Sequence, residues 1–569
     1  MVMARTEVTA IIVPQNTDKP SSAREKGNEN MNPSPIPNKF IILLVILSLA
    51  SSLIPVHSTP YDYGYVSHAA ERVFHGEILY RDFVHYYSPG HVYGPALFYL
   101  IFGITTYSLI LYWAFFNVLI CITLFYISKH IWNNRLFIHF LPIMYIFFVQ
   151  PSLYVGSDRL FFPILTTLLI YNYYRRGNKI WLYLSGLSLS AAYLFSYEVA
   201  FLETFPFIIF IVIKSGVQEN RFIPASFLKN INKLISELAI FITGVLTLAV
   251  PVFLYFLVKA GYRDMFYWLV WVPLVPYSKY LSIPLLGYFT HLSIDKLVEG
   301  FSLYLEIVVY SSFIVYLIYK LILQRHFSAM NLNLFLILLF GLFLFKIATV
   351  RSDHTHFMFA VLPAFILFAF STIEMMRLLK KKYSSRLLRA FANIVFLVII
   401  ICMSVYGEYE WVMYFHRPSD YGWLQPERGH ILMHKKWVDD LNGVVRYAVG
   451  RTEDSDYIFV IPAEAYIYFL SRRKNPTKND SYHKGELILV KQAEAIKNLE
   501  EKKPKLIIFG GIYKLEFSEY YKLIFSYIYD NYQLTEKIGK YEVYTPRAYG
   551  DFLKWKSSIQ SLNSVCGRD

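Results

Sequence analysis

One segment of this chain, residues 59–103, contains carboxylates and arginines directly after an apolar stretch long enough to cross a membrane. Set among glycines and tyrosines, its ionisable residues include Asp62, Glu71, Glu77, Arg81 and Asp82. A carboxylate in such a place can act as a general base that takes a proton from a hydroxyl group. An arginine can hold a phosphate through two parallel hydrogen bonds. The segment therefore predicts a site where a carboxylate meets a hydroxyl-bearing substrate.

Three further groups of ionisable residues border apolar runs. They are Asp158 and Arg159 in VGSDRLFFP, Glu198 in SYEVAFLE, and Arg351, Asp353, His354 and His356 in VRSDHTHF. Charged side chains inside or beside a membrane span are costly unless they are paired or line a wet cavity. All of them are therefore candidate binding or catalytic residues.

The sequence leaves a structural alternative open for several of these candidates. Asp62 is suited to be the N-cap of the helix expected from YGYVSHAAERVFHG, because aspartate is a favoured N-cap residue. The adjacent residues Arg81 and Asp82 would form a local turn pair. In the same way, Asp158 and Arg159 would form an ion pair at the end of a span.

The remaining candidates have alternatives of their own. Glu198 would be a satisfied buried polar group. His354 and His356 resemble half of a metal site, because two rings at this spacing face one side of an extended chain. Two such ligands with Asp353 nearby leave a divalent metal open, while nothing in the sequence requires a cofactor.

The composition is that of a membrane protein. Of the 569 residues, 55% are hydrophobic and only 17% charged, and the 48 Tyr and 47 Phe far exceed ordinary soluble usage. The net charge of +14 would suit nucleic acid, but the basic residues lie in short loops between apolar runs, which argues against a nucleic-acid partner. The three cysteines are scattered, so neither a disulfide framework nor a zinc cluster is indicated.

Apolar runs predict about eleven transmembrane helices. They cover residues 40–57, 107–128, 136–150, 160–174, 180–196, 199–213, 235–258, 298–320, 331–348, 356–375 and 390–406. Loop charges follow the positive-inside rule if the N-terminus is cytoplasmic and the C-terminal region is extracytoplasmic. A cleaved signal peptide at 40–57 is the alternative, but the polar leader before it is too long for an ordinary n-region. In this topology all the candidate site residues fall on the outer face.

Two polar parts flank the membrane region of residues 39–406, whose first external loop is 58–105. Residues 1–38 are rich in Ser, Asn, Pro and charge, which predicts a disordered cytoplasmic tail. Residues 407–569 predict a small extracytoplasmic α/β domain, with buried strands at 456–462 and 505–511 and amphipathic helices at 484–504 and 517–532.

The run YDYGYVSHAAERVFHGEILYRDF, followed by SPGHVYGPALFYLIFG, resembles the first external loop of GT-C class membrane glycosyltransferases. It is most similar to relatives of protein O-mannosyltransferases, lipid A aminoarabinose transferases and lipopolysaccharide-core galacturonosyltransferases. SDRLFFP, RSDHTHF and IYFLSRRKNPTK extend the resemblance. Many relatives carry an Asp-Glu pair, whereas here Asp62 is followed by Tyr63.

The resemblance implies an inverting transferase at the outer face of the plasma (inner) membrane, with a polyprenyl-phosphate-linked sugar as donor. The acceptor is left open as a lipid, a glycan or a protein. Asp62 would be the catalytic base, with Asp82 or Asp158 as a second carboxylate. The donor phosphate would be bound by residues drawn from Arg81, Arg159, Arg351, His354 and His356, with Asp158, Glu198 and Asp353 beside them.

Two other functions remain open at this stage. A flippase or transporter of lipid-linked glycan would be expected to carry ionisable residues in mid-span and internally repeated halves, and neither is clear in the sequence. A surface polysaccharide polymerase or ligase would use a diphosphate-linked donor and differs from the first hypothesis only through the loop resemblance.

Overall fold

The computed structural model of the protein describes residues 38–53, 56–57, 60–131, 138–152, 156–218, 221–222, 229–285, 287–290, 300–324, 328–382, 414–424, 427–429, 431–510 and 518–547. The chain forms two compact units, Met1–Ile42 and Leu43–Asp569, and every contact discussed below lies within the second.

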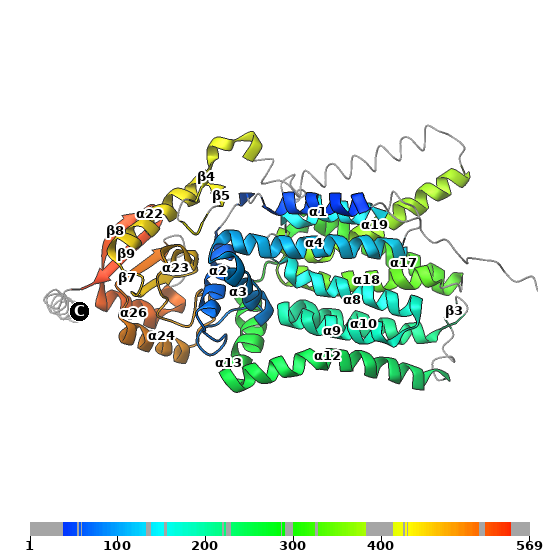
Figure 1. Ribbon diagram of the computed structural model, residues 1–569, viewed down its shortest axis with the longest axis horizontal. Coiled ribbons are helices and arrows are strands. Elements are labelled where there is room, and N and C mark those ends of the chain that lie inside the picture. The colour runs from blue at the N-terminus through cyan, green and yellow to red at the C-terminus, as the bar shows by residue number, and fades with distance from the viewer. Residues whose placement is uncertain are drawn as a thin grey trace, which may run out of the picture. The chain divides into compact units, whose positions relative to one another are not determined.

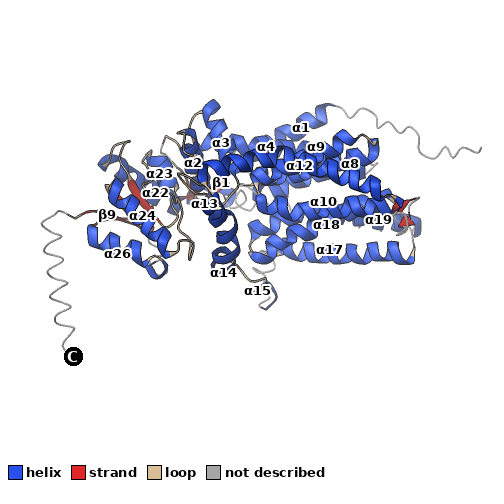
Figure 2. Ribbon diagram, turned by 90° about the horizontal axis from the view of Figure 1, so that it is seen from below, coloured by secondary structure: helices blue, strands red, loops and turns tan. Residues whose placement is uncertain are grey.

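Long helices account for most of the described residues, and strands are few (Figure 1, Figure 2). The long helices are α1 (Asn38–Leu53), α4 (Thr106–Ile131), α8 (Ser157–Arg176), α9 (Lys179–Phe195), α10 (Tyr197–Gly216), α12 (Ile231–Ala260), α17 (Phe301–Ile318), α18 (Ala329–Val350) and α19 (His354–Lys382). A further helical stretch runs through α6 (Phe140–Met144), the π-helical turn η1 (Tyr145–Val149) and α7 (Gln150–Ser152), and η4 (Tyr319–Leu323) extends α17.

Each expected span that the structure describes contains a helix, although the first is not helical to its predicted end. Six helices of the described part are long and apolar enough to cross a membrane, at Thr106–Ile131, Tyr197–Gly216, Ile231–Ala260, Leu303–Ile322, Met330–Ile347 and His356–Glu374. Shorter apolar helices lie at Lys39–Leu53 and Phe140–Val149. The chain is thus a multi-pass α-helical membrane protein. The expected span at 390–406 lies outside the described residues, so the number eleven stays a prediction.

Several span boundaries differ from expectation by a few residues, and two of these differences bear on the site. The first helix ends at Leu53, and β1 (Val56–His57) follows within the stretch expected to be helical. Pro55 between them lacks the N–H that a continuing helix would need. Helix α8 begins at Ser157, ahead of the expected start at residue 160. Its first turn can include Asp158 because that carboxylate has buried partners, as shown below, and complements the helix dipole.

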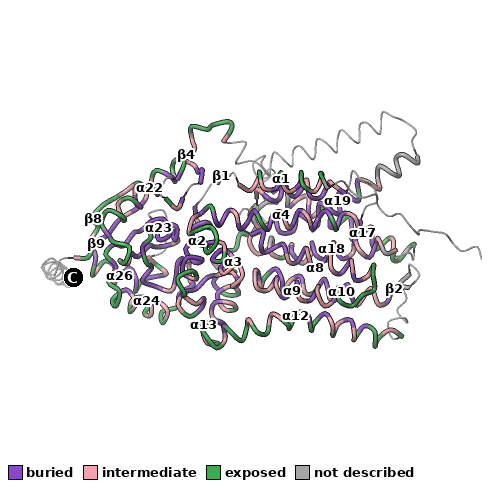
Figure 3. Tube along the Cα trace, viewed as in Figure 1, coloured by how far each residue is buried: buried purple, intermediate pink, exposed green. Residues whose placement is uncertain are grey.

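Two helices of the first loop, α2 (Tyr61–Phe74) and α3 (Pro89–Phe102), pack against each other. Shorter elements follow α12: α13 (Tyr262–Phe266), the π-helical turns η2 (Tyr267–Trp271) and η3 (Pro273–Tyr277), α14 (Ser278–Tyr280) and α15 (Gly287–Thr290). Burial differs between these parts, since α2 is mostly buried while α12 carries exposed residues along its length (Figure 3).

The C-terminal part contains a four-stranded mixed sheet of order β6-β7-β9-β8. Its strands are β6 (Ile458–Ile461), β7 (Leu506–Gly510), β8 (Tyr532–Ile538) and β9 (Tyr541–Pro546). Only β6 and β7 pair in parallel, and every residue of both is buried. The accompanying helices are α22 (Lys435–Arg451), α23 (Tyr466–Ser471), α24 (Leu489–Lys502) and α26 (Lys522–Asn531).

The expected α/β composition of this part is confirmed, although the β8–β9 hairpin was not foreseen.

The remaining strands of the described residues form two smaller sheets. In the first, β1 pairs in parallel with β5 (Leu432–His434), and β5 pairs antiparallel with β4 (Tyr421–Trp423). The 3₁₀ turn η5 (Pro418–Asp420) directly precedes β4. A second pair joins β2 (Val217–Gln218) and β3 (Arg221–Phe222). The expected domain boundary at 406 falls within residues 383–413, outside the described part.

Candidate active site

Asp62 lies half-buried in the first turn of α2, one residue after the helix begins. The N-cap of this helix is Pro60, so the alternative that Asp62 itself caps the helix is wrong. Close packing fixes the helix next to it, because a Cβ on Gly64 would lie 2.3 Å from Cβ of Tyr466 in α23. Only glycine allows α2 and α23 to approach so closely.

Tyr87 lies in the segment between α2 and α3. Its side chain is influenced by the charges of both Asp62 and Arg159. Burial raises the pKa of the Tyr87 phenol, the negative charge of Asp62 raises it further, and the positive charge of Arg159 lowers it. The guanidinium carbon of Arg159 lies 4.7 Å from the centre of the Tyr87 ring. The structure therefore brings the acid of α2 and the arginine of α8 to the same tyrosine.

Arg159 is held on several sides in a buried position. Its Nε donates to Oγ of Ser196 at 3.3 Å, and its Nη2 donates to Oε2 of Glu198 at 3.4 Å. The ring of Phe359 covers it at 4.7 Å. The side chain of Glu198 is 44% exposed, so this pair has one buried cation and one accessible anion. Glu198 is thus not the satisfied buried group that the sequence left open.

Asp158 is engaged with other partners than Arg159. Its Oδ2 lies 2.6 Å from Nδ1 of His91 and accepts a hydrogen bond from the hydroxyl of Tyr112 at 2.7 Å. The side chains of Asp158 and His91 are fully buried. The ion pair with Arg159 that the sequence left open is therefore wrong, and Asp158 joins α3, α4 and α8 in the interior.

A second arginine cluster follows α18. Nε of Arg351 donates to Oδ2 of Asp353 at 2.8 Å, and Oδ1 of Asp353 lies 2.6 Å from Nδ1 of His356. Burial alone would raise the pKa of Asp353, but His356 and Arg351 outweigh it and lower that pKa to about 2. Asp353 is therefore ionised at neutral pH and orients both partners.

Tyr277 of η3 links the two arginine clusters. Its hydroxyl lies 3.4 Å from Nε2 of His356. Burial raises the pKa of Tyr277, while the charges of Arg351 and Arg159 lower it. Both guanidinium groups thus act on one phenol, which places residues from α8, η3 and the start of α19 around a common point.

Arg81 and Asp82 form the local pair that the sequence left open. Nε and Nη2 of Arg81 lie 2.9 and 2.7 Å from the two oxygens of Asp82, which also accepts from the backbone N–H of Ile78 at 2.8 Å. Both side chains are partly exposed. Among the contacts of the described residues, none joins this pair to Tyr87, Arg159 or Tyr277.

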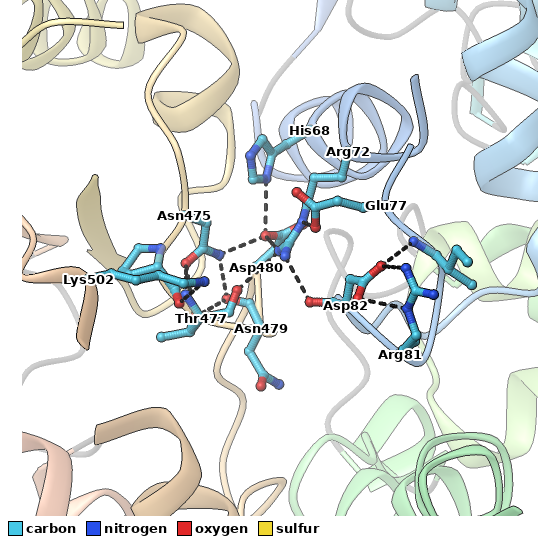
Figure 4. Close-up of polar contacts among 12 residues, drawn as sticks. His68, Arg72, Glu77, Arg81, Asp82, Asn475, Thr477, Asn479, Asp480 and Lys502 are labelled. Atoms are coloured by element: carbon cyan, nitrogen blue, oxygen red, sulfur yellow. Dashed lines mark hydrogen bonds and ion pairs between the residues drawn. The ribbon is translucent and has the colours of Figure 1, made fainter. Parts of the chain in front are cut away.

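An ionic network that sequence reasoning missed ties the first loop to the C-terminal part (Figure 4). Buried Arg72 of α2 donates to Oδ1 of Asp480 at 3.0 Å, to Oε2 of Glu77 at 2.8 Å and to the carbonyl oxygens of Thr477 and Asp82. Asp480 also accepts from Asn475 at 2.8 Å and lies 3.0 Å from Nδ1 of His68. The motif RRKNPTK was singled out by resemblance, and its asparagine and threonine belong to this network.

The beginning of α2 meets the C-terminal sheet as well. Nζ of Lys540 lies 4.0 Å from the ring centre of Trp437 and 5.5 Å from that of Tyr61. The same ammonium group donates to Oε1 of Glu464 at 2.7 Å. Because Tyr61 directly precedes Asp62, this contact holds the backbone that carries the candidate base.

A metal site is not assembled in the part of the chain that the structure describes, where no three His, Cys, Asp or Glu side chains are placed to hold an ion. Nδ1 of His356 is engaged with Asp353, and the side chain of His354 is outside the described set. What the described arrangement offers is a half-buried carboxylate whose charge acts on Tyr87, with the guanidinium of Arg159 over that ring and Arg159 and Arg351 both acting on Tyr277. Such a set of groups suits proton removal beside an anionic group.

Solved structures that are similar to this chain over 90% of its length include the following two. One is ArnT from Cupriavidus metallidurans bound to undecaprenyl phosphate, with 12% identity, a TM-score of 0.51 and 99% of that chain covered. The other is the Archaeoglobus fulgidus oligosaccharyltransferase tethered to an acceptor peptide, with 11% identity, a TM-score of 0.52 and 75% of that chain covered.

No protein-family model matches the sequence, and no curated protein matches it either. At such low identity the structural likeness speaks for the fold alone. It agrees with the resemblance seen in the first loop, and both point to the same architecture. The chain therefore has the fold of these two structures, the GT-C fold that its first loop resembles.

Proposed function

We propose that this protein is a membrane glycosyltransferase that moves a sugar from a polyprenyl-phosphate donor to an acceptor hydroxyl. The observation that carries the proposal is that Arg159 lies over Tyr87, whose phenol also feels the charge of Asp62, while Arg159 and Arg351 both act on the phenol of Tyr277. An acid and two cations at one place suit the removal of a proton and the stabilisation of a departing phosphate. The similar ArnT structure, which holds undecaprenyl phosphate, supports this type of donor.

In the proposed reaction, the acceptor hydroxyl gives its proton to the Asp62 carboxylate as its oxygen attacks the anomeric carbon. The bond from that carbon to the phosphate oxygen breaks, the electron pair stays with the phosphate, and the sugar carbon inverts. Arg159 and Arg351 would bind the phosphate as its charge grows. Glu198 and Asp353 would hold these arginines in place before the donor arrives.

The roles first considered for Asp82 and Asp158 fit less well. The carboxylate of Asp158 is fully buried against His91 and Tyr112, and that of Asp82 is engaged with Arg81 and Ile78. We therefore propose Asp62 as the sole catalytic base. Asp158 is instead a residue that positions α8. Arg81 becomes a poorer candidate for the phosphate than Arg159 and Arg351.

For the location, we propose the plasma membrane with the N-terminal tail in the cytoplasm and residues 407–569 outside. The loop charges support this orientation. The acceptor is a lipid, a glycan or a protein, and the sugar is a hexose or a pentose. Mass spectrometry of lipid-linked sugars and surface glycans, in cells with wild-type protein and cells with Asp62→Asn, tests the function directly. A polyprenyl-phosphate sugar should accumulate and one surface glycan should be lost in the variant cells.

The orientation gives a prediction of its own. Protease added from outside should cleave the C-terminal part and leave the N-terminal tail intact, because the basic inner loops retain the tail in the cytoplasm. Epitope tags placed before residue 38 and after residue 547 would report the two fragments on immunoblots. Cleavage of the N-terminal tag in intact cells would contradict the topology.

Arg351 provides a prediction about the donor. Arg351→Ala should raise the KM for the polyprenyl-phosphate sugar and lower kcat, because a phosphate contact strengthens as the leaving group gains charge. Arg351→Lys should keep part of the activity, since the charge survives while the two-bond geometry is lost.

Kinetics in nanodiscs with varied donor, at saturating acceptor, measure this effect. Arg446→Ala, an exposed arginine of α22, is the matched control and should behave as wild type. An unchanged donor KM in folded Arg351→Ala would leave Arg159 as the phosphate ligand.

A further inference from the structure

One membrane span marks the edge of the hydrocarbon layer beside the C-terminal part. In α12 the run from Leu238 to Val258 contains no charged residue, with Glu237 before it and Lys259 after it. Such a run has the ~20 residues that a bilayer core requires. Val258 is 80% exposed, so it faces the surroundings of the protein and not its interior. The layer therefore ends close to Val258.

Apolar surface continues past this edge. In α13, directly after α12, Tyr262 is 65% exposed and Phe266 is 59% exposed. Aromatic side chains are enriched at the level of lipid headgroups, where one end is apolar and the other meets water. Lys259 and Arg263 are exposed beside them and suit the phosphates of lipid headgroups.

Three consecutive aliphatic residues of the C-terminal part are also exposed. Ile488, Leu489 and Val490 lie at the start of α24 and are 44%, 67% and 72% exposed. A single exposed leucine is ordinary, but a contiguous apolar patch at a polar domain's surface marks a contact with something apolar.

Direct contacts place this triplet next to α13. Nζ of Lys491 lies 2.8 Å from Oδ1 of Asp264, and the backbone N–H of Ile488 donates to the hydroxyl of Tyr267 at 3.4 Å. The patch thus lies beside α13, which follows the lipid-facing helix α12.

We propose that Ile488, Leu489 and Val490 insert into the headgroup layer of the bilayer beside Tyr262 and Phe266, as a second membrane contact of the chain. The contact fixes the segment that leads back to the site. His483 precedes the triplet by five residues, and its pKa is lowered by burial and by the charge of Arg351. The membrane contact therefore lies five residues from a buried side chain on which the charge of Arg351 acts. Whether the protein transfers sugar does not enter this argument.

The test uses single cysteines labelled with bimane in the full-length protein, with Cys402→Ser and Cys566→Ser as background, since Cys121 is buried. The protein is placed in nanodiscs of phosphatidylcholine and phosphatidylglycerol, with and without brominated acyl chains. Leu489→Cys reports the patch, and Val490→Cys gives a second position. Val258→Cys is the control inside the membrane, and Leu534→Cys, 47% exposed on β8, is the control in water.

We expect brominated lipid to cause a loss of fluorescence at Leu489 and Val490 that approaches the loss at Val258, with none at Leu534. Fluorescence at both patch positions that is as insensitive to bromine as Leu534 would overturn the proposal. Shielding from aqueous iodide without quenching by brominated lipid would also overturn it, because a second copy of the chain would then cover the patch.

Discussion

Asp62→Asn should lower sugar transfer by about 10²–10⁴-fold, the usual contribution of a positioned general base. Asparagine keeps the size and shape of the side chain but cannot take up the proton of the acceptor hydroxyl. Asp62 lies half-buried in the first turn of α2, so the exchange leaves the packing of Gly64 against Tyr466 intact. Turnover of a labelled polyprenyl-phosphate sugar by purified protein in nanodiscs measures the loss.

Two variants make this measurement specific. Asp439→Asn changes an exposed aspartate of α22 and should retain full activity. Asp82→Asn tests the other acid of the loop. If Asp62→Asn were active while Asp82→Asn was not, the base would be Asp82. The residues around Tyr87 would then not form the catalytic site.

Arg72→Met should destabilise the protein by about 3–5 kcal/mol, the usual cost of removing one partner from a buried ion pair. Methionine fills much of the space but leaves the Asp480 carboxylate buried without its arginine and leaves the carbonyl of Thr477 without that donor. Because α2 carries Asp62, transfer activity should fall together with the melting temperature. Thermal unfolding in nanodiscs, followed by intrinsic fluorescence, measures the first effect.

The network also predicts how the effects combine. Arg72→Met with Asp480→Asn should be less destabilised than the sum of the single variants, since each single change leaves an uncompensated partner. Arg446→Met, an exposed arginine on α22, is the control for general effects. Additive losses in the double variant would mean that the two side chains do not act as a pair.

The pH dependence of this pair has a definite sign. Burial by itself would raise the pKa of Asp480, but the charges of His68 and Arg72 hold it well below its usual range. A carboxyl with a depressed folded-state pKa contributes stability above its unfolded pKa of about 3.9 and loses it as the pH falls below that value. The wild-type protein should therefore lose more stability on acidification than Asp480→Asn.

Much of the helical architecture could be predicted from the sequence because lipid imposes a strong condition on it. A span must be apolar over its length, so runs such as Leu238–Val258 stand out without any knowledge of their neighbours. The buried strands β6 and β7 were predictable for a related reason, since both faces are covered and the runs are continuously apolar. The hairpin of β8 and β9 is half exposed and mixed in composition, which explains why it was missed.

The site was predictable by residue type and only partly by contact. Charges at span edges identified Arg159, Glu198, Arg351 and Asp353, all of which lie in the two arginine clusters. Adjacency in sequence misled the pairing of Asp158, because successive residues of a helix point in different directions and do not face each other. His91 and Tyr87 were missed because nothing local distinguishes a site tyrosine from the many interfacial ones.

The position of α2 between two distant parts of the chain limits how such a protein can change. Its first residue is held by Lys540, Gly64 packs against Tyr466, and its last turns are held by Asp480, while the charge of its Asp62 acts on Tyr87. A hybrid that took its C-terminal part from a related enzyme would set foreign side chains against all three points of α2 at once. Exchange between relatives would therefore succeed only if the first loop and the C-terminal part came from the same enzyme, although the two lie far apart in the sequence.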